Sequence, residues 1–270
     1  MNTILFTSYK NRKDNDAVAA LKYCVDNLEI SACILDGEIV NEVFEQMCSE
    51  LSVPVYTRDN MLRSITAGTI QRPEIGLAYH YHSMINKDLL QFPKNGIINF
   101  HPAPLPEHKG VSACTYAILH KYTQWGVTAH YMDEGFDTGP IIKVQNFNID
   151  NCDCSSIVLQ RINYRHLLNL FKEIVDILAS GVIPASKQQE ETGHYYSRKH
   201  LEEDKVISVT DSKDIINHKI KSMWFPPYHG ANITIDGEKF TLVNERILEE
   251  LEEMYSLVLE DHKELFGGLE

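Results

Sequence analysis

The sequence lacks long apolar runs and any excess of positive charge. No stretch of its 270 residues approaches the roughly 18 consecutive apolar residues that a membrane-spanning helix needs. Lys and Arg number 25 against 38 Asp and Glu, which gives a net charge of −13 with neutral histidines. Most of such a surface would repel a polyanion. These absences argue against a membrane protein and against nucleic acid as the main partner, although a small anionic ligand needs only a local basic pocket.

Export and disulfide signals are also missing. The first residues, Met1 to Phe6, contain no basic segment and too short an apolar run for a secretion signal. The six cysteines lie mostly within apolar segments, so we expect reduced thiols and a cytoplasmic protein. Cys152 and Cys154 have the spacing of a soft-metal pair, but no second pair accompanies them. The sequence therefore favours a surface loop there and no metal site.

The first half of the chain alternates strand and helix patterns. An apolar fraction of 43% suits a globular protein. The short apolar runs that we expect to be strands cover residues 3–7, 31–35, 53–55, 74–79 and 96–101. Between them, apolar residues recur at helical spacing, as at Ala17, Leu21, Cys24 and Leu28. The alternation predicts a Rossmann-like α/β fold with a mainly parallel sheet, and ligand sites beyond the carboxyl ends of its strands.

The second half changes character near residue 200. Its predicted elements are helices at 112–121, 157–178, 211–224 and 245–265, a strand at 126–131, and a hairpin that turns at Asp236-Gly237. A turn-rich loop at 133–139 follows the predicted strand. The sequence therefore predicts a catalytic domain at 1–200 and a small α+β carboxy-terminal domain at 201–270.

A candidate catalytic group follows the run at 96–101. Asn99 and His101 have one residue between them, so both side chains project from the same face of a strand. An amide that can stabilise an oxyanion, beside an imidazole that can move protons, suits attack on a carbonyl. Asp137 lies in a glycine-containing loop, where it can orient His101 and raise its pKa. From spacing alone, Asn99 and Asp137 as loop caps and His101 as an ordinary turn residue explain the pattern as well.

Two longer motifs carry a resemblance to a known family. They are the segment 99–106 (NFHPAPLP), followed by Lys109-Gly110, and the segment 133–140 (DEGFDTGP). Both resemble signatures of the formyltransferases that use N10-formyltetrahydrofolate, and the likeness extends over about residues 1–200. In that family an Asn-x-His pair and a later Asp form the catalytic trio. The resemblance implies these roles for Asn99, His101 and Asp137, with folate as co-substrate and no metal.

The resemblance leaves the acceptor amine open. Residues 195–198 (YYSR) and 223–231 (MWFPPYHGA) are similar to segments of the sugar N-formyltransferases. That likeness implies transfer to the 3- or 4-amino group of a nucleotide-linked amino-deoxy sugar. Methionyl-tRNA formyltransferases carry a larger carboxy-terminal domain, and glycinamide ribonucleotide formyltransferases are usually a single shorter domain. Those two acceptors, hydrolysis of the formyl folate, and a binding module without catalysis remain the alternatives.

The family resemblance also suggests binding residues. The folate would lie against the loops 79–85 and 133–139, where the expected contacts are Tyr79, His82, Met84, Ile85, Leu90, Asp133, Gly135 and Phe136. A nucleoside diphosphate needs aromatic faces and cations. The residues expected near it are Lys10, Arg12, Pro102, Lys109, Arg198, Trp224 and Tyr228. Trp224 also suits an apolar contact that joins the two predicted domains.

Two further patterns have alternative interpretations. His80 and His82 have the spacing of a metal pair on a strand, but a pocket lining or a plain loop is favoured over a metal. In the last predicted helix, Leu248, Leu251, Tyr255 and Val258 form an apolar stripe. The stripe predicts either docking on the protein's own domain or the contact of a homodimer.

Overall fold

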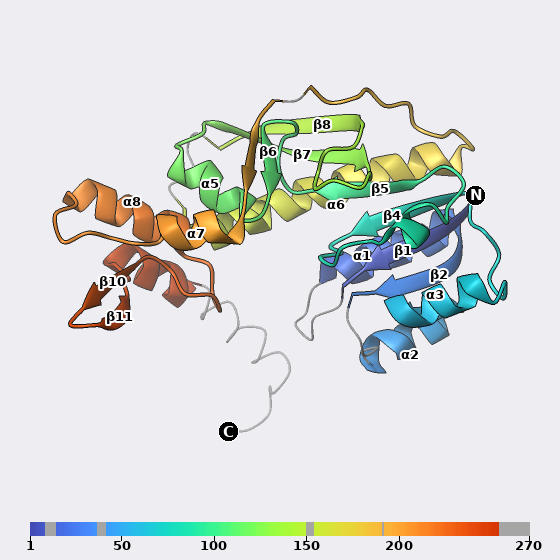
Figure 1. Cartoon of the computed structure of the whole chain (residues 1–270), viewed down its shortest axis with the longest axis horizontal. Coiled ribbons are helices and arrows are strands. Elements are labelled where there is room, and N and C mark those ends of the chain that lie inside the picture. Colours follow the sequence, from blue (N-terminus) through green and yellow to red (C-terminus); the bar gives the residue numbers. More distant parts are fainter. Residues whose placement is uncertain (9–14, 37–41, 150–153, 191, 254–270) are drawn as a thin grey trace, which may run out of the picture. The chain divides into compact units, whose positions relative to one another are not determined.

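The computed structural model describes residues 1–8, 15–36, 42–149, 154–190 and 192–253. Figure 1 shows its helices and strands. The helices are α1 (Asn15–Asn27), α2 (Glu42–Glu50), α3 (Arg58–Thr66), α4 (Lys87–Leu90), α5 (Ala113–Leu119), α6 (Ser156–Ala179), α7 (Arg198–Asp204) and α8 (Lys213–Met223). The strands are β1 (Asn2–Thr7), β2 (Glu29–Leu35), β3 (Val55–Thr57), β4 (Ile75–Tyr79), β5 (Ile97–His101), β6 (His108–Gly110), β7 (Gln124–Tyr131), β8 (Ile141–Asn148), β9 (His194–Tyr196), β10 (Asn232–Ile235) and β11 (Glu238–Thr241). Residues 245–253 are also helical.

A seven-stranded sheet organises the larger part of the chain. Its order is β3-β2-β1-β4-β5-β7-β8. The strands from β3 to β5 are parallel, whereas β7 runs antiparallel to β5 and to β8. The chain builds the sheet outward from β1 in one direction and then continues from β4 in the other. Such a reversal leaves a crevice at the carboxyl ends of the strands, where ligands of open α/β sheets bind.

The two faces of this sheet are covered by different helices. One face, here called the α6 face, packs Leu5, Leu77 and Phe100 against residues of α1, α2 and α6. The other, here called the α3 face, packs Phe6 and Ile97 against α3 and α4. Neighbouring residues of a strand alternate between the faces because side chains of a strand point in opposite directions in turn. Apolar burial on both faces explains the continuous apolar runs in the sequence.

The chain divides into two compact units. The main unit contains the described residues of Met1–Gly110, Gln124–Asn148 and Ile162–Tyr195. The second unit contains those of Val111–Thr123 and Ile149–Arg161 and those from Tyr196 onward. Its own buried cluster consists of Ile207, Ile220, Met223, Ala231 and Ile247. The predicted domain boundary at residue 200 stays a prediction, because it concerns which segment folds independently.

The structure confirms the predicted α/β class and most predicted elements. The hairpin β10–β11 turns at Asp236 and Gly237, which both have positive φ angles, as a type I′ hairpin turn requires. Strand β8 and the antiparallel direction of β7 were not predicted. Tyr255, Val258 and the end of the predicted last helix lie outside the described residues, so the apolar stripe stays a prediction.

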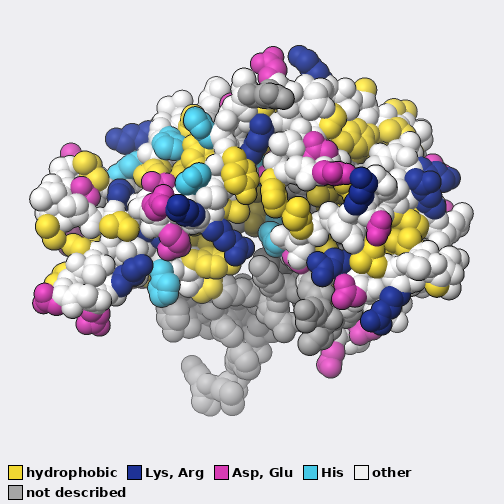
Figure 2. Space-filling view, in the orientation of Figure 1, with side chains coloured by type: hydrophobic (Ala, Val, Ile, Leu, Met, Phe, Trp, Pro, Cys, Tyr) yellow, Lys and Arg dark blue, Asp and Glu magenta, His cyan; other side chains and the backbone are white. Residues whose placement is uncertain are grey.

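Three observations bear on the predictions from absences. Within the described ranges, no helix combines the length and hydrophobicity needed to cross a bilayer. On the face shown in Figure 2, basic side chains of the described residues are interspersed with acidic ones. Cys24, Cys33, Cys48 and Cys114 are buried and not in disulfides, but Cys154 is disulfide-bonded. The expectation of reduced cysteines is therefore wrong at Cys154, because sequence position alone does not reveal oxidation.

Candidate active site

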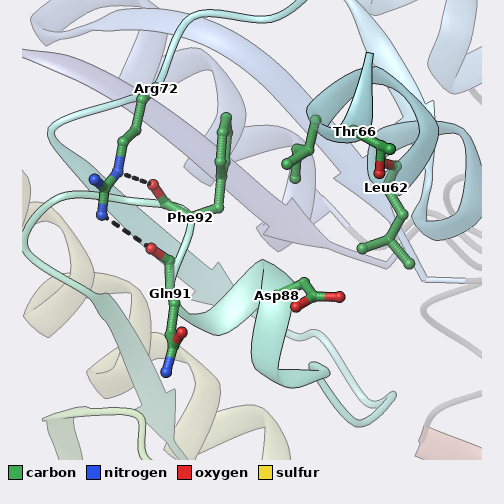
Figure 3. Close-up of a pocket in the computed structure, with 7 residues that line it drawn as sticks. Leu62, Thr66, Arg72, Asp88, Gln91 and Phe92 are labelled. Atoms are coloured by element: carbon green, nitrogen blue, oxygen red, sulfur yellow. Dashed lines mark hydrogen bonds between the residues drawn. The ribbon is translucent and has the colours of Figure 1, made fainter. Parts of the chain in front are cut away.

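A cavity of about 500 Å³ lies in the main unit beside α3 and α4 (Figure 3). Its lining consists of Leu62, Ile65, Thr66, Arg72, Asp88, Gln91 and Phe92. Arg72 donates hydrogen bonds from Nε to the Phe92 carbonyl (2.7 Å) and from Nη2 to the Gln91 carbonyl (3.1 Å). The guanidinium therefore fastens the loop before β4 to the end of α4. The predicted catalytic residues lie elsewhere, on β5 and in the loop after β7.

Antiparallel pairing of β5 with β7 brings four polar side chains together. Asn99 lies opposite His130, and His101 lies opposite Thr128. All four belong to the α3 face, since they alternate with residues of the α6 face along each strand. The apolar cluster of the α3 face includes Ile97, and the next two positions of β5 on that face are Asn99 and His101. On this face the strand therefore changes from apolar core residues to polar residues at its carboxyl end.

The proline-rich segment after β5 is fastened to this group from two sides. Thr128 donates a hydrogen bond from Oγ1 to the Ala103 carbonyl (2.7 Å) and accepts one from the Leu105 amide (3.1 Å). Asn163 of α6 donates to the Pro102 carbonyl (2.7 Å). Prolines cannot take part in a regular ladder, so side chains hold this segment instead.

Asp137 lies in the loop between β7 and β8. Its φ is +56°, in the left-handed region that residues other than glycine rarely adopt. Asp133 shapes the loop, because its Oδ1 accepts hydrogen bonds from the Gly135 amide (3.0 Å) and from Thr138 Oγ1 (2.7 Å). A Cβ at Gly139 would lie 1.8 Å from a backbone oxygen at the end of β7, so the return of the loop requires glycine there.

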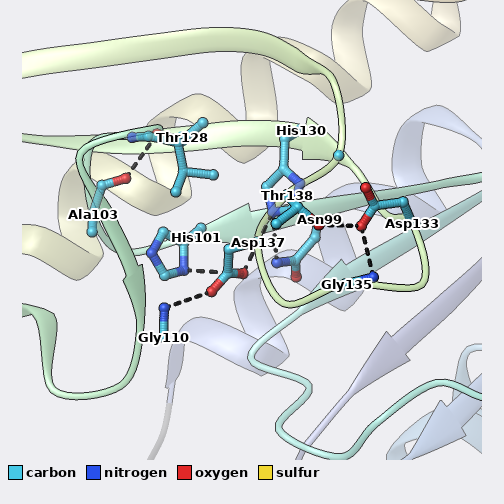
Figure 4. A network of polar contacts seen from close by, with 12 residues as sticks. Asn99, His101, Ala103, Gly110, Thr128, His130, Asp133, Gly135, Asp137 and Thr138 are labelled. Atoms are coloured by element: carbon cyan, nitrogen blue, oxygen red, sulfur yellow. Dashed lines mark hydrogen bonds and ion pairs between the residues drawn. The ribbon is translucent and has the colours of Figure 1, made fainter. Parts of the chain in front are cut away.

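The Asp137 carboxylate faces His101, His130 and a backbone amide (Figure 4). Oδ2 accepts a hydrogen bond from the Gly110 amide (2.9 Å). Oδ1 lies 3.5 Å from His101 Nδ1 and 3.7 Å from His130 Nε2. The other nitrogen of His101, Nε2, lies 2.9 Å from the His108 carbonyl. A carbonyl only accepts hydrogen bonds, so the neutral ring carries its proton on Nε2 and leaves Nδ1 free to take one up beside the carboxylate.

Burial and charge set the protonation states of this pair in opposite directions. Burial lowers the pKa of His101 below its ordinary value, and attraction to Asp137 opposes that effect only in part. Burial alone would raise the pKa of Asp137, but attraction to His101 and the hydrogen bond from the Gly110 amide bring it well below its ordinary value. At neutral pH the site therefore holds a neutral imidazole beside an ionised carboxylate.

His130 is a site residue that the sequence analysis missed. Its Nδ1 lies 2.9 Å from the Tyr131 carbonyl, and its Nε2 lies 3.1 Å from Asn99 Nδ2. The carbonyl fixes the proton on Nδ1, so Nε2 accepts a hydrogen bond from the Asn99 amide. The amide keeps a second N–H for another acceptor. A sequence signal existed, because Thr128 and His130 are polar residues at alternate positions of an otherwise apolar strand.

Together these groups can assist nucleophilic attack on a carbonyl carbon. Asn99 supplies a donor for an oxyanion. His101 can act as a neutral base, and Asp137 can stabilise the imidazolium that would form if His101 took up a proton. Within the described residues, no three His, Cys, Asp or Glu side chains are grouped as metal ligands are.

The residues predicted to bind folate fall into exposed and buried sets. Met84 and Phe136 are 61% and 54% exposed and therefore free to contact a ligand. His82 is also exposed, and its amide donates to Asp36 Oδ2 (3.0 Å). Asp133 and Gly135 belong to the exposed loop around Asp137.

The buried set has core contacts. The Tyr79 ring is fully buried and packs against Phe100 and Phe171. Ile85 is buried in the cluster of the α3 face, and Leu90 packs against that cluster. For Tyr79 and Ile85 the side chain is therefore occupied by the core, and the backbone remains for a ligand.

The residues predicted to bind the nucleotide are spread over both units. In the main unit, Lys109 donates from Nζ to the Thr192 carbonyl (3.0 Å), and Pro102 is half-buried. Arg198, at the start of α7, is exposed. Lys10 and Arg12 lie outside the described residues.

The two predicted aromatic residues of the second unit differ in their surroundings. Trp224 packs against the buried cluster of that unit, and its carbonyl accepts a hydrogen bond from Ser156 Oγ (2.9 Å). Tyr228 is 62% exposed, with its ring centroid 6.1 Å from that of Phe225. Tyr228 therefore has a free face for a planar ligand, whereas Trp224 is largely used in packing.

Comparison with known proteins finds a family match over the segment that contains this site. Residues 38–170 match the family model described as formyl transferase. They include both strands of the polar cluster and the Asp137 loop. Residues 38–170 are therefore similar to the formyl transferase family, and the resemblance seen in the motifs is confirmed for this segment.

Particular relatives point to acceptors of different kinds. The chain is 32% identical to GDP-perosamine N-formyltransferase from Brucella melitensis over 62% of its own length and 63% of the relative's. It is 26% identical to methionyl-tRNA formyltransferase from Syntrophomonas wolfei over 66% of its length and 56% of the relative's. The chain thus spans less than two thirds of each of these relatives.

A solved structure extends the likeness of the fold to most of the chain. The N-formyltransferase from Helicobacter canadensis, solved with folinic acid and dTDP-3-aminofucose, superposes with a TM-score of 0.68. The match covers 91% of this chain and 89% of that one, at 22% identity. The similarity therefore includes the second unit, and it is a similarity of fold.

Proposed function

We propose that the protein transfers the formyl group of N10-formyltetrahydrofolate to the amine of a nucleotide-linked amino-deoxy sugar, at C3 or C4. The observation that carries the proposal is the grouping of Asn99, His101 and Asp137 within the segment that matches the formyl transferase family. The name of the Brucella relative and the ligands of the Helicobacter structure support a nucleotide sugar as acceptor.

In the proposed reaction the sugar amine attacks the formyl carbon. The carbonyl electrons move to oxygen, and the free N–H of Asn99 donates a hydrogen bond to that oxyanion. His101 Nδ1 takes the proton that the amine loses, and Asp137 stabilises the resulting imidazolium. When the intermediate collapses, the bond from carbon to N10 breaks and N10 receives the proton. The products are a formamide on the sugar and tetrahydrofolate.

The folate would lie between the loops 79–85 and 133–139. A pterin is flat with a hydrogen-bonding edge, so it needs apolar covers and backbone partners. The exposed Met84 and Phe136 suit the first need. The loop backbone, including that of Gly135, suits the second. Tyr79 and Ile85 would contribute through their backbone, since their side chains are buried.

The nucleotide sugar would need only two or three cations, because it carries two phosphates. Lys109 and Arg198 are proposed for this role, together with Lys10 and Arg12. Tyr228 is proposed to stack on the base because its ring is exposed. We also propose that residues 1–200 form the catalytic domain, which supplies these cations, and that residues 201–270 form the small carboxy-terminal domain, which supplies Tyr228.

A screen of acceptors tests the proposal. The purified protein is incubated with N10-formyltetrahydrofolate and, in separate reactions, with GDP-, dTDP- and UDP-linked 3- and 4-amino sugars. Formamide formation on at least one of them, absent in the His101→Asn protein, is the expected result. Turnover of charged initiator tRNA or glycinamide ribonucleotide alone would contradict the sugar acceptor, and formate release without any acceptor would identify a hydrolase instead.

Two further proposals concern where the enzyme acts and its oligomeric state. We propose that the enzyme acts in the cytoplasm, where folate and nucleotide sugars are available, and that it forms a homodimer. Sedimentation of the purified protein tests the homodimer, and a monomer at micromolar concentration would contradict it.

A further inference from the structure

The segment between α6 and β9 runs along the loop that carries Asp137. Lys187 pairs with Ile141, the first residue of β8, through two backbone hydrogen bonds of 2.8 Å. Two residues later, the side chain of Gln189 reaches the loop itself. Its Nε2 donates to the Asp137 carbonyl (3.0 Å) and to the Gly139 carbonyl (2.7 Å).

The direction of this side chain amide is determined by its partners. Both backbone groups are carbonyls, which only accept hydrogen bonds, so the nitrogen must face them. Among the described residues, Gln189 Oε1 is buried and has no hydrogen-bond partner. Gln189 therefore contacts the loop through its nitrogen, which holds the carbonyl of Asp137 and the carbonyl of Gly139, two residues later.

Asp137 needs such support because of its backbone conformation. A φ of +56° places an aspartate in a region that disfavours residues with a Cβ. This conformation directs the carboxylate to the Gly110 amide and to His101. If Asp137 relaxed to an ordinary φ, its carboxylate would leave these partners. The carbonyl that Gln189 holds and the carboxylate that faces His101 both belong to Asp137, so holding the one helps to keep the other in place.

From this geometry we propose that Gln189 is a positioning residue for Asp137. It holds the carbonyls of Asp137 and Gly139 and thereby keeps the carboxylate aimed at His101. The proposal rests on the proposed function, since it assumes that Asp137 assists proton transfer. Gln189 touches neither the imidazole nor the carboxylate and acts through the backbone alone.

A pair of matched variants tests this role. Gln189→Met keeps the length and approximate volume of the side chain and adds no charge, but it removes both hydrogen bonds. Gln188→Met makes the same change one residue earlier, where the amide makes a single long contact of 3.4 Å with the Thr138 carbonyl. We expect kcat to fall roughly 10- to 100-fold in Gln189→Met, with both KM values within about 3-fold of wild type, and to change little in Gln188→Met. Assays are run well below the melting temperature of each variant.

A double variant separates positioning from general support of the fold. If Gln189 acts through the carboxylate, adding Gln189→Met to Asp137→Asn lowers kcat by less than about 2-fold further, because coupled sites are not additive. Multiplicative losses, or a full kcat in Gln189→Met, would overturn the inference. A full kcat in Asp137→Asn would instead overturn the proposed catalytic role, so the two failures are distinguishable.

Discussion

The His101 imidazole and the Asp137 carboxylate lie 3.5 Å apart, and both side chains are largely buried. Replacing either by asparagine keeps the size of the side chain approximately but removes the base or its charge partner. We expect His101→Asn and Asp137→Asn each to lower kcat by on the order of 100-fold or more. Steady-state kinetics with circular dichroism as the folding control check this. Near-full activity in both well-folded proteins would contradict the assignment.

The low pKa of His101 predicts how activity depends on pH. The neutral ring is the active form, and burial lowers its pKa below the ordinary value of about 6.5. At pH 6.5 an ordinary histidine is half protonated, whereas His101 is more than half neutral. We therefore expect the midpoint of the acid limb of kcat/KM to lie below pH 6.5.

The Asp137→Asn protein tests the direction in which this pH dependence should shift. The carboxylate raises the pKa of His101 against the effect of burial. Removing that charge should move the acid limb of the residual activity to still lower pH. A limb that moves upward in the variant would show that another group controls the profile.

At the scale of elements, Gly193 allows the segment before β9 to lie close to the chain before β6, and Gly181 provides a comparison. Gly193 and Gly181 both have φ of +85°. A Cβ at Gly193 would lie 1.9 Å from the Pro106 carbonyl oxygen, whereas a Cβ at Gly181 would meet nothing within 4 Å. We expect Gly181→Ala to cost about 1 kcal/mol of unfolding free energy. Gly193→Ala should cost clearly more, roughly 2–4 kcal/mol, because backbone must also move.

Urea unfolding of the two variants measures this difference. Gly193→Ala should also lower kcat, since β6 ends at Gly110, whose amide binds Asp137. Equal midpoints for the two variants would show that the segment shifts without cost. Gly181→Ala serves as the control for the left-handed backbone alone.

Elements were predictable from the sequence to different degrees. β1 and β5 are buried on both faces, so continuous apolar runs identify them. β8 is an edge strand of half-exposed and exposed residues, and its mixed sequence has no such signal. The direction of β7 was unpredictable because it depends on pairing with β5, which is distant in the chain.

The site shows the same limits. Asn99, His101 and Asp137 were predictable as candidate site residues because two motifs contain them and resemble those of a known family. His130 and Gln189 act through neighbours that only the folded chain supplies. Their roles follow from a cross-strand pairing and from a side chain that crosses 52 positions of sequence to reach the Asp137 carbonyl.

At the scale of the whole molecule, two aromatic residues of the second unit allow a role in stability to be separated from a role in binding the nucleotide. Trp224 packs against the buried cluster of the second unit, whereas Tyr228 is largely exposed. Trp224→Ala should lower the unfolding free energy by about 2 kcal/mol or more. Tyr228→Ala should leave stability unchanged and raise KM for the sugar nucleotide roughly 5- to 150-fold, as loss of a base stack worth 1–3 kcal/mol implies.

Thermal unfolding and separate KM values for the two substrates check these variants. The KM for the folate should stay nearly constant in Tyr228→Ala. If Trp224→Ala instead keeps its stability and loses affinity for the nucleotide, then Trp224 and not Tyr228 is the stacking residue.

The direct pairing of Asn99 with His130 constrains how the chain can change in length. One residue inserted into β7 before His130 would invert the alternation of the strand beyond it, so the imidazole would face the α6 side of the sheet. Insertions between Tyr196 and the hairpin β10–β11 leave that ladder intact. We therefore expect changes in length to be tolerated between Tyr196 and the hairpin but to disrupt the geometry of the site when they fall within β5 or β7.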